Sequence, residues 1–439
     1  MKRFAFAALL ATVALAPAAA ADNGAAAPTS AAAAAPKAGL IPTADLAHRA
    51  IYTDPQLSPD GLWLLAELGD KEKGAILLAS ITTGELRSFA LPKGWDLVSY
   101  RWAGNARVLI SVGKTIPLLG EDAFVTRLIS YDLATRKGDF VGSIMQGPEG
   151  DDILYVDPEG KWLLLSIQKT IYDYPSVFRV DLATRDMKEV VRQRDDVWEW
   201  FADKSGVVRA GMGFQEEKWS LVYRPSEAAP FKRAGSARYD DKNASLRLIG
   251  FAQDGDQGYV LSSEKTGRSA VYRFNYATLE TGDLVFESKT NDISDIFLSA
   301  DSKTVEAAFY TDDRDRVEWF DPEMKQIQTA LDGALKGKEA WIVSRSRDRS
   351  RMLVLVTGAN DPGSYYYLQP ATGAMHRLAF VNERMKGYKL APSKPISYKA
   401  RDGLTIHGYL TLPTDRDSRS LPLIILPHGG PYNVRDRGD

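Results

Sequence analysis

The sequence contains no cysteine, which excludes disulfide bonds, thiolate metal sites and a cysteine nucleophile. Histidine is also scarce: His48, His376, His407 and His428 are the four present, and none forms a close-spaced pair of the kind that binds zinc. A Gly-x-Ser-x-Gly sequence is missing as well, so the chain has no nucleophile elbow. We therefore expect neither a metal nor another cofactor.

An excess of one charge is likewise lacking. The 55 Lys and Arg residues nearly balance the 57 Asp and Glu residues, which leaves a formal net charge of −2, and the two signs are interspersed. Because no basic patch or tail stands out, nucleic acid is not an expected partner. The 439 residues are 44% hydrophobic, which is ample material for large buried cores.

The first 40 residues have the pattern of an export signal followed by a leader. Two basic residues precede an apolar segment from Phe4 to Leu15, and the small residues Ala19 to Ala21 follow as a cleavage site. We predict a signal peptide over residues 1–21 and an Ala/Pro-rich disordered leader over 22–40. An uncleaved anchor is the alternative, although the apolar segment is short for a bilayer. The mature protein is expected to be periplasmic or secreted, without membrane contact.

Two kinds of turn alternate along the middle of the chain. Ser58-Pro59-Asp60-Gly61 represents the first kind and Asp132-Leu133-Ala134-Thr135-Arg136 the second, and the pair Asp321-Pro322 fills one place of the second kind more weakly. Together they mark seven units spaced roughly 45–54 residues apart, the size of a blade of four short strands. This predicts an all-β, seven-bladed β-propeller over residues 41–388. A two-sheet sandwich would not produce so many evenly spaced hairpins.

After the repeats, residues 389–439 follow a different pattern. Two strand-like runs, Lys394 to Ala400 and Leu404 to Leu412, flank a tight turn at Asp402-Gly403. The apolar run Leu421 to Leu426 is a third expected strand, and a His-Gly-Gly-Pro turn follows it. Two antiparallel strands before a buried third strand are the way an α/β-hydrolase sheet begins. In such a sheet the glycine turn forms half of the oxyanion hole.

The strings Tyr398 to Leu410 and Pro422 to Tyr432 resemble the prolyl oligopeptidase family, and most closely its acylaminoacyl-peptidase and dipeptidyl-peptidase-like branch. The resemblance implies a serine peptidase that acts on short peptides, with the propeller restricting access to the active site. It also implies that the backbone N–H of Gly430 helps to hold the oxyanion while Gly429 shapes the loop. The remaining residues implied to support this loop are His428, Pro431 and Tyr432.

The Ser/Asp/His triad of that family matches no residue of this chain. A hydrolase domain of this type needs roughly 200 or more residues, and about 50 follow the propeller. We therefore expect the chain to be truncated before the nucleophile and inactive alone. Two alternatives remain open: a secreted propeller that serves as an interaction scaffold without catalysis, and a fragment of an esterase-type hydrolase. The oligomeric state is not predicted.

One further pair of residues is a candidate for substrate binding. Glu216 and Glu217 lie side by side between two strand-like runs. Paired carboxylates that face a cavity could bind the free amino terminus of a peptide, as in some propeller peptidases. A solvated hairpin tip is the simpler interpretation of the same pair.

Overall fold

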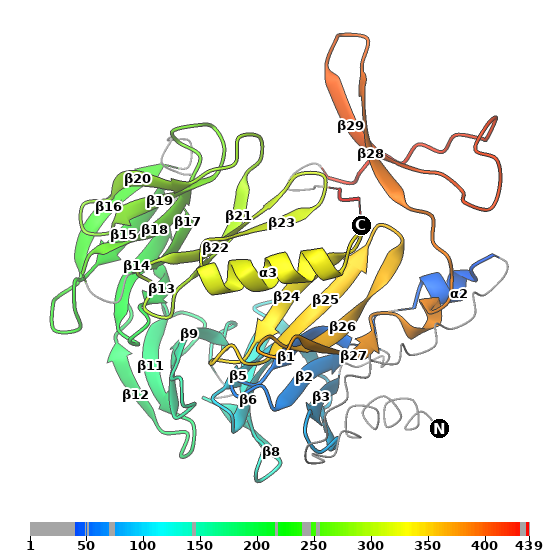
Figure 1. Cartoon of the computed structure of the whole chain (residues 1–439). Helices are drawn as coiled ribbons and strands as arrows, with labels where there is room; N and C mark the ends of the chain where they lie inside the picture. Colours follow the sequence, from blue (N-terminus) through cyan, green and yellow to red (C-terminus); the bar gives the residue numbers. More distant parts are fainter. Residues whose placement is uncertain are drawn as a thin grey trace. The chain divides into compact units, whose positions relative to one another are not determined.

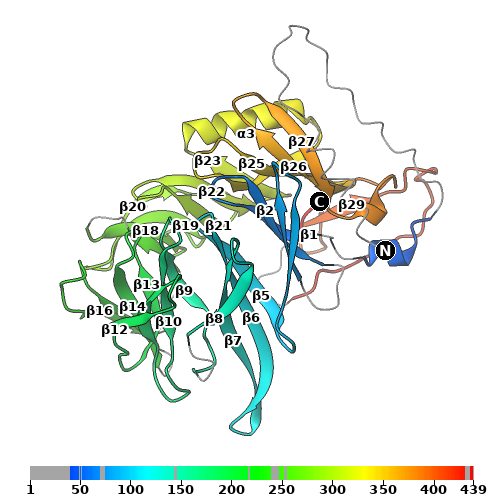
Figure 2. The same cartoon turned by 90° about the horizontal axis from the view of Figure 1, so that it is seen from below.

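The computed structural model describes residues 40–48, 50, 52–69, 75–142, 146–215, 218–238, 247–251, 255–430 and 436–438. The predicted signal peptide lies outside this part of the chain, as does nearly all of the predicted leader. Four candidate site residues also lie outside it: Glu216, Glu217, Pro431 and Tyr432. The described chain is dominated by antiparallel strands (Figures 1 and 2).

Seven successive segments each fold into an antiparallel sheet in which strands consecutive in sequence are hydrogen-bonded neighbours. Six of these sheets have four strands and one has three strands within the described residues. This topology is the one expected for blades built from consecutive hairpins. The predicted seven-bladed β-propeller is confirmed.

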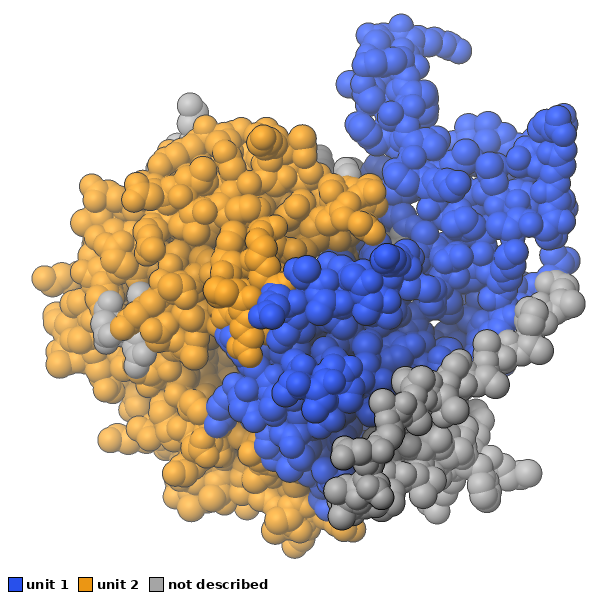
Figure 3. All heavy atoms as spheres, viewed as in Figure 1, with its two compact units in different colours: residues 1–91, 326–439 blue, residues 92–325 orange. Residues whose placement is uncertain are grey.

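The chain divides into two compact units, one comprising residues 1–91 and 326–439 and the other residues 92–325 (Figure 3). The first unit contains the first and last blades. The strands of these two blades are β1 (Tyr52–Leu57), β2 (Trp63–Leu68), β3 (Ala75–Ser80), β4 (Leu86–Ala90), β24 (Glu339–Arg345), β25 (Met352–Gly358), β26 (Asp361–Gln369) and β27 (Ala374–Phe380).

The first and last blades pack against each other within this unit. Leu57 and Leu353 belong to one buried hydrophobic cluster, and the backbone N–H of Leu57 donates to Ser344 Oγ at 2.9 Å. The short helix α2 (Thr43–Leu46) and the 3₁₀ helix η2 (Glu383–Met385) flank these blades in sequence. Segments 287 residues apart are therefore hydrogen-bonded neighbours, as a circular repeat architecture requires.

The second unit contains the five middle blades. Their strands are β5 (Asp96–Ala103), β6 (Arg107–Leu118), β7 (Glu121–Asp132), β8 (Lys137–Val141), β9 (Asp152–Val156), β10 (Trp162–Ile167), β11 (Ser176–Asp181), β12 (Met187–Val191), β13 (Val197–Ala202), β14 (Val208–Gln215), β15 (Lys218–Tyr223), β16 (Lys232–Arg238), β17 (Arg247–Phe251), β18 (Gln257–Ser262), β19 (Ala270–Asn275), β20 (Glu280–Phe286), β21 (Ile293–Leu298), β22 (Val305–Thr311) and β23 (Asp315–Trp319).

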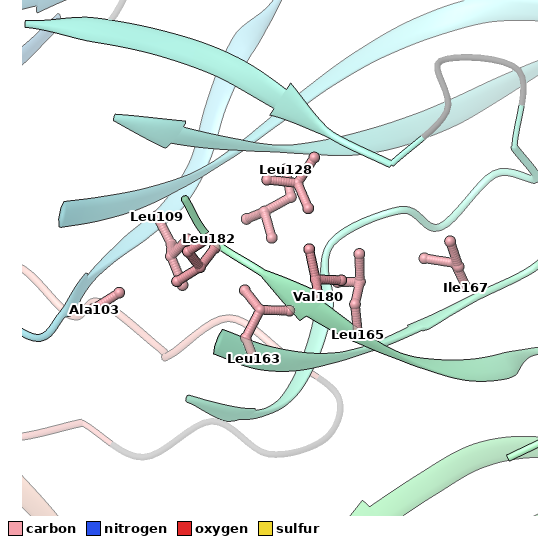
Figure 4. Packing of buried hydrophobic residues seen from close by; sticks show 9 residues of the cluster. Ala103, Leu109, Leu128, Leu163, Leu165, Ile167, Val180 and Leu182 are labelled. Carbon is pink, nitrogen blue, oxygen red and sulfur yellow. The ribbon is translucent and has the colours of Figure 1, made fainter. Parts of the chain in front are cut away.

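Aliphatic side chains fill the space between successive blades, as the packing of β5–β8 against β9–β12 shows (Figure 4). Leu109 and Leu128 come from the first of these sheets, and Leu163, Leu165 and Val180 from the second, each at most 1% exposed. Burying such a side chain contributes about 1.5–3 kcal/mol relative to leaving it in water. Both faces of these central strands are buried, which explains why they are nearly continuous apolar runs.

The turns that join the first two strands of each of these blades also contact each other. Gly104 and Gly160 have φ angles of +59° and +69°, a region that residues with a Cβ avoid. A Cβ on Gly160 would lie 2.1 Å from the carbonyl oxygen of Ala103, and one on Gly104 would lie 2.5 Å from that of Glu159. Glycine is therefore required twice over at this contact, by backbone conformation and by space.

The sixth blade departs from the predicted pattern. The pair Asp321-Pro322, predicted to be a turn, begins the helix α3 (Pro322–Ala334). Asp321 Oδ1 accepts a hydrogen bond from the N–H of Met324 at 2.9 Å, so Asp321 caps the helix. Proline in the first helical turn leaves no hydrogen bond unmade. The three strands β21–β23 are thus followed by a helix instead of a fourth strand.

Beyond the propeller, β28 (Ser393–Lys399) and β29 (Thr405–Thr411) form the predicted hairpin, whose turn contains Gly403. The expected third strand is not formed. Residues 421–430 adopt no regular structure, and the side chains of Ile425 and Leu426 are 75% and 86% exposed. A strand needs a hydrogen-bonding neighbour. Within the described residues β28 and β29 pair with each other, and neither pairs with residues 421–426. No described helix is both long and apolar enough to cross a membrane.

Candidate functional site

The predicted oxyanion loop is exposed to solvent. His428, Gly429 and Gly430 all lie on the surface, and a Cβ added to Gly429 would meet no atom within 4 Å. The ring Nδ1 of His428 faces the carbonyl oxygen of its neighbour Gly429. An exposed backbone N–H at Gly430 can reach an incoming oxygen, but the sequence contains no Gly-x-Ser-x-Gly nucleophile elbow to act with it. The assignment of Gly429 and Gly430 to an oxyanion hole stays a prediction.

A second candidate lies in the middle blades and was not predicted. Three successive sheets enclose a cavity of about 470 Å³, a volume within the range of small-molecule sites. Its wall includes β5 and β6 of the second blade, the start of β9, and β13 of the fourth blade. The lining residues are Ser99, Tyr100, Arg101, Leu109, Ser111, Leu128, Glu149, Asp151, Asp152, Ile153, Trp198, Glu199, Trp200 and Phe201.

Negative charge dominates the lining. Four carboxylates, from Glu149, Asp151, Asp152 and Glu199, face one guanidinium, from Arg101. Aromatic rings form another part of the wall, among them Trp198, which is 44% exposed. The indole of Trp198 packs edge-on against Tyr174 with ring centres 4.8 Å apart. The cavity can therefore offer acceptor oxygens and an apolar surface to the same ligand.

The loop that carries Glu149 and Asp151 is held from behind by a buried arginine. Arg127, on β7, is 5% exposed and donates to the carbonyl oxygens of Gln146 at 2.9 Å and Gly147 at 3.0 Å. The backbone of the loop is tied to the same strand, because the N–H of Thr126 donates to the carbonyl of Pro148 at 2.8 Å. Charged donors make strong bonds to carbonyls, so Arg127 fixes the course of this loop.

Hydroxyl groups orient the carboxylate of Asp151. Ser111 Oγ donates to one of its oxygens and Thr126 Oγ1 donates to the other. Thr126 Oγ1 also accepts from the N–H of Gly150 at 3.2 Å. Asp151 thus has hydrogen-bond partners within the wall, while among the described residues the carboxylates of Glu149 and Glu199 form no hydrogen bond or ion pair.

Burial and nearby negative charges raise the pKa values of two of these acids, Asp152 and Glu199. The pKa of Asp152 is raised to about 6: burial is the largest cause, a hydrogen bond from Ser166 opposes it, and the negative charges of Glu149, Asp151 and Glu199 add to the increase. Burial, and then the charge of Glu149, raise the pKa of Glu199. Asp152 is still reached by water because it lines a concave cavity. Raised carboxyl pKa values signal negative charge without full compensation.

Sequence reasoning missed this cavity because its acids come from distant segments. The run Glu149-Gly150-Asp151-Asp152 was visible as a local acidic cluster, but Glu199 lies in the next blade, almost 50 residues further along the chain. The propeller repeat could have suggested that β9 and β13 lie near each other. The candidate pair Glu216 and Glu217 lies outside the described residues.

Comparison with known proteins agrees with the resemblance noted in the sequence. No family model matches the chain. In sequence, it is 21% identical over 277 residues to dipeptidyl aminopeptidase BIII of Pseudoxanthomonas mexicana, covering 62% of this chain and 40% of that protein. The chain thus spans less than half the length of this curated relative.

Solved structures share the fold. A prolyl endopeptidase matches with a TM-score of 0.54 at 13% identity, over 84% of this chain and 55% of the other. Prolyl oligopeptidase B of Galerina marginata matches with a TM-score of 0.53 at 14% identity, over 83% and 56%. A puromycin-hydrolyzing peptidase of Mycobacterium tuberculosis matches with a TM-score of 0.53 at 14% identity, over 87% and 62%. Each alignment covers most of this chain but little more than half of its counterpart.

Proposed function

Since the chain is related to the peptidases of the prolyl oligopeptidase family, we propose that it is the propeller and the opening part of the hydrolase domain of a serine peptidase that cleaves short peptides. One observation carries the proposal: a seven-bladed propeller is followed directly by the β28–β29 hairpin and the exposed His428-Gly429-Gly430 segment. Fold alone does not define an activity, but here the glycine turn supplies a chemical element as well.

In the proposed reaction, the N–H of Gly430 donates to the oxygen of the substrate carbonyl as it becomes an oxyanion. A single donor of this kind contributes about 10²–10³-fold to the rate. The nucleophile and its base are supplied by a Gly-x-Ser-x-Gly segment and its partners, which these 439 residues do not contain. The chain by itself is therefore inactive in this proposal, and activity belongs to a polypeptide with the complete hydrolase domain.

The direct test is to express residues 22–439 together with the coding sequence that follows codon 439, and to assay short peptide amides and simple esters. Hydrolysis of the amides supports a peptidase. Hydrolysis of esters alone indicates the esterase alternative. No triad in that coding sequence, or no hydrolysis of either substrate by the folded protein, contradicts the proposal and leaves the interaction scaffold.

The contribution of the glycine turn can be tested in the same protein. Gly430→Pro removes the donating N–H, whereas Gly430→Ala retains it. We expect kcat to fall about 10²–10³-fold in the proline variant, with a much smaller change in the alanine variant. Equal losses in both variants would show that the loop needs glycine for another reason.

The propeller is proposed to limit the substrate to short peptides, and the N-terminal residues to direct export. For the first point, kcat/KM should fall steeply as peptides lengthen beyond the size that passes the propeller. For the second, cell fractionation should recover the mature protein from the periplasm or medium. Retention of the uncleaved chain in the cytosol would contradict the export proposal.

A further inference from the structure

We propose that the cavity between β5, β9 and β13 binds the cationic side chain of a lysine or arginine residue in a peptide. The identity of the ligand as a peptide rests on the proposed function, but the chemistry of recognition rests on the cavity itself. The residues that make it are the carboxylates of Glu149, Asp152 and Glu199 and the ring of Trp198. Asp151 and Arg127 position the loop.

Charge gives the first argument. Four carboxylates against one guanidinium in the lining of a cavity of about 470 Å³ leave an excess of negative charge at a site that water reaches. Like charges brought close together cost free energy, and this repulsion contributes to the raised pKa values of Asp152 and Glu199. A bound cation would remove that cost. Arg101 does not do so, since within the part of the chain that the structure describes it forms no ion pair with these acids.

The shape of the lining gives the second argument and points to an elongated cation. Trp198, Tyr100 and Phe201 provide apolar surface beside the carboxylates. Lysine and arginine have aliphatic stems that pack on apolar surface while the charged head meets polar groups. A bare metal ion fits less well, because no three potential metal-ligating side chains converge closely enough to hold one anywhere in the described ranges.

The third argument is that hydrogen bonds from neighbouring side chains fix the conformation of the acidic loop. Arg127 is buried and binds two carbonyl groups of the loop, and two hydroxyls hold Asp151. Such preorganisation lowers the entropy lost when a ligand binds.

A buried amide lies directly behind the loop. The side chain of Gln146 is 5% exposed, and neither of its polar atoms has a hydrogen-bond partner among the residues that the structure describes. Its Nε2 lies 1.9 Å from the place that a Cβ on Gly150 would take, so it is directed at the backbone between Glu149 and Asp151. A buried polar group without a partner is costly. Gln146 is not among the residues that line the cavity, so it contacts the acidic loop from outside the proposed binding site.

The test measures binding to the full chain by isothermal titration calorimetry, without any hydrolysis. Three blocked peptides serve as probes: acetyl-Gly-Lys-Gly-amide, acetyl-Gly-Arg-Gly-amide and acetyl-Gly-norleucine-Gly-amide. Norleucine keeps the aliphatic stem and lacks the charge. We expect the two cationic peptides to bind at least about 10-fold more tightly than the norleucine peptide, as loss of a charge-assisted hydrogen bond predicts.

Variants locate the site. Glu199→Gln and Asp152→Asn should each weaken the lysine peptide about 10-fold, whereas Asp283→Asn, at an exposed position on β20, should leave binding unchanged. Unfolding curves must show that the variants are folded. Equal binding of all three peptides, or equal binding by wild type and the two cavity variants, overturns the proposal.

A fourth probe separates the two sources of a peptide cation. Gly-norleucine-Gly-amide carries a free amino terminus and no basic side chain. If it binds as tightly as the blocked lysine peptide, the cavity recognises an amino terminus and the side-chain assignment is wrong. Because no probe needs to be cleaved, failure here leaves the proposed peptidase function standing, and an inactive hydrolase domain leaves this proposal standing.

Discussion

The guanidinium of Arg127 lies with Nη2 2.9 Å from the carbonyl oxygen of Gln146, and both residues are 5% exposed. Burial lowers the pKa of Arg127, although the nearby charge of Asp151 opposes this effect. The buried guanidinium has lost its hydrogen bonds to water, and it donates instead to backbone carbonyls of a loop that has no regular secondary structure. The arrangement links a buried residue of β7 to the wall of the acidic cavity.

Replacing this arginine should loosen the loop. Arg127→Met leaves the carbonyls of Gln146 and Gly147 without a donor, and each buried unsatisfied group costs about 1–3 kcal/mol. We expect the free energy of unfolding to fall by at least about 2 kcal/mol, and amide exchange in residues 146–151 to accelerate more than in β10. Retained protection of the loop would show that its backbone contacts suffice.

The buried ion pair between Arg209 and Asp203 should contribute more than an exposed one. Arg209 Nη1 lies 3.1 Å from Asp203 Oδ2, and both side chains are 3% exposed. Arg209→Met removes the charged partner of a buried carboxylate, whose other oxygen still accepts hydrogen bonds from Ser205 and Val207, and should cost about 3–5 kcal/mol in urea unfolding. The matched control is Arg247→Met, which removes an exposed 2.8 Å pair with Asp295 and should cost less than about 1 kcal/mol. Similar losses would contradict this ranking.

Two glycines with the same conformation should differ in their tolerance of alanine. Gly160 and Gly373 have φ angles of +69° and +68°, but only at Gly160 would a Cβ meet backbone, the carbonyl of Ala103 at 2.1 Å. Gly373→Ala should cost about 1–2 kcal/mol for the left-handed conformation alone. Gly160→Ala adds about 1–3 kcal/mol of overpacking. Equal urea midpoints for the two variants would mean that the turns of the second and third blades can separate without cost.

The stability of the protein should depend on pH through Asp152. Its pKa is about 6 in the folded protein and 3.8 as the ordinary value, so the folded state binds the proton more tightly. The resulting stabilisation is complete below about pH 4 and is lost as the pH rises through 6.

Asp152→Asn removes this dependence and provides its test. Because water enters the cavity, we expect a gain of about 1 kcal/mol at pH 7.5 instead of the larger value for a fully buried acid. The gain should vanish near pH 4. Thermal melts across this range, with Asp283→Asn as the control, measure it. A gain that is independent of pH would indicate a cause other than titration.

The exposed apolar run should promote self-association. Ile424, Ile425 and Leu426 are 75–86% exposed and have no neighbouring strand in the described structure. Unpaired apolar segments of this kind are templates for aggregation. A protein that ends at Thr414 keeps the β28–β29 hairpin and should elute as a smaller species in size-exclusion chromatography than the 439-residue chain. Ile425→Lys should have the same effect, and identical elution of all three would contradict the explanation.

Much of the fold was predictable because its signals are local. The Ser58-Pro59-Asp60-Gly61 and Asp132 to Arg136 types of turn recur at blade spacing, and each lies at a hairpin in the structure. The turn predicted at Asp321-Pro322 was wrong for an equally local reason, because aspartate before proline is compatible with the start of a helix as well as with a turn. The strand expected at Leu421 to Leu426 is not formed. An apolar run indicates that a segment is suited to burial, but it does not identify the neighbouring strand with which the segment would pair.

Sequence by itself determined the repeat and the hairpin that follows it, since turn residues and strand periods act over a few positions. Tertiary structure alone decided that Glu199 meets Glu149, Asp151 and Asp152, and that Arg127 supports their loop. These residues are joined by the packing of successive blades, which brings side chains together through space. Electrostatic effects such as the raised pKa of Asp152 arise from that proximity.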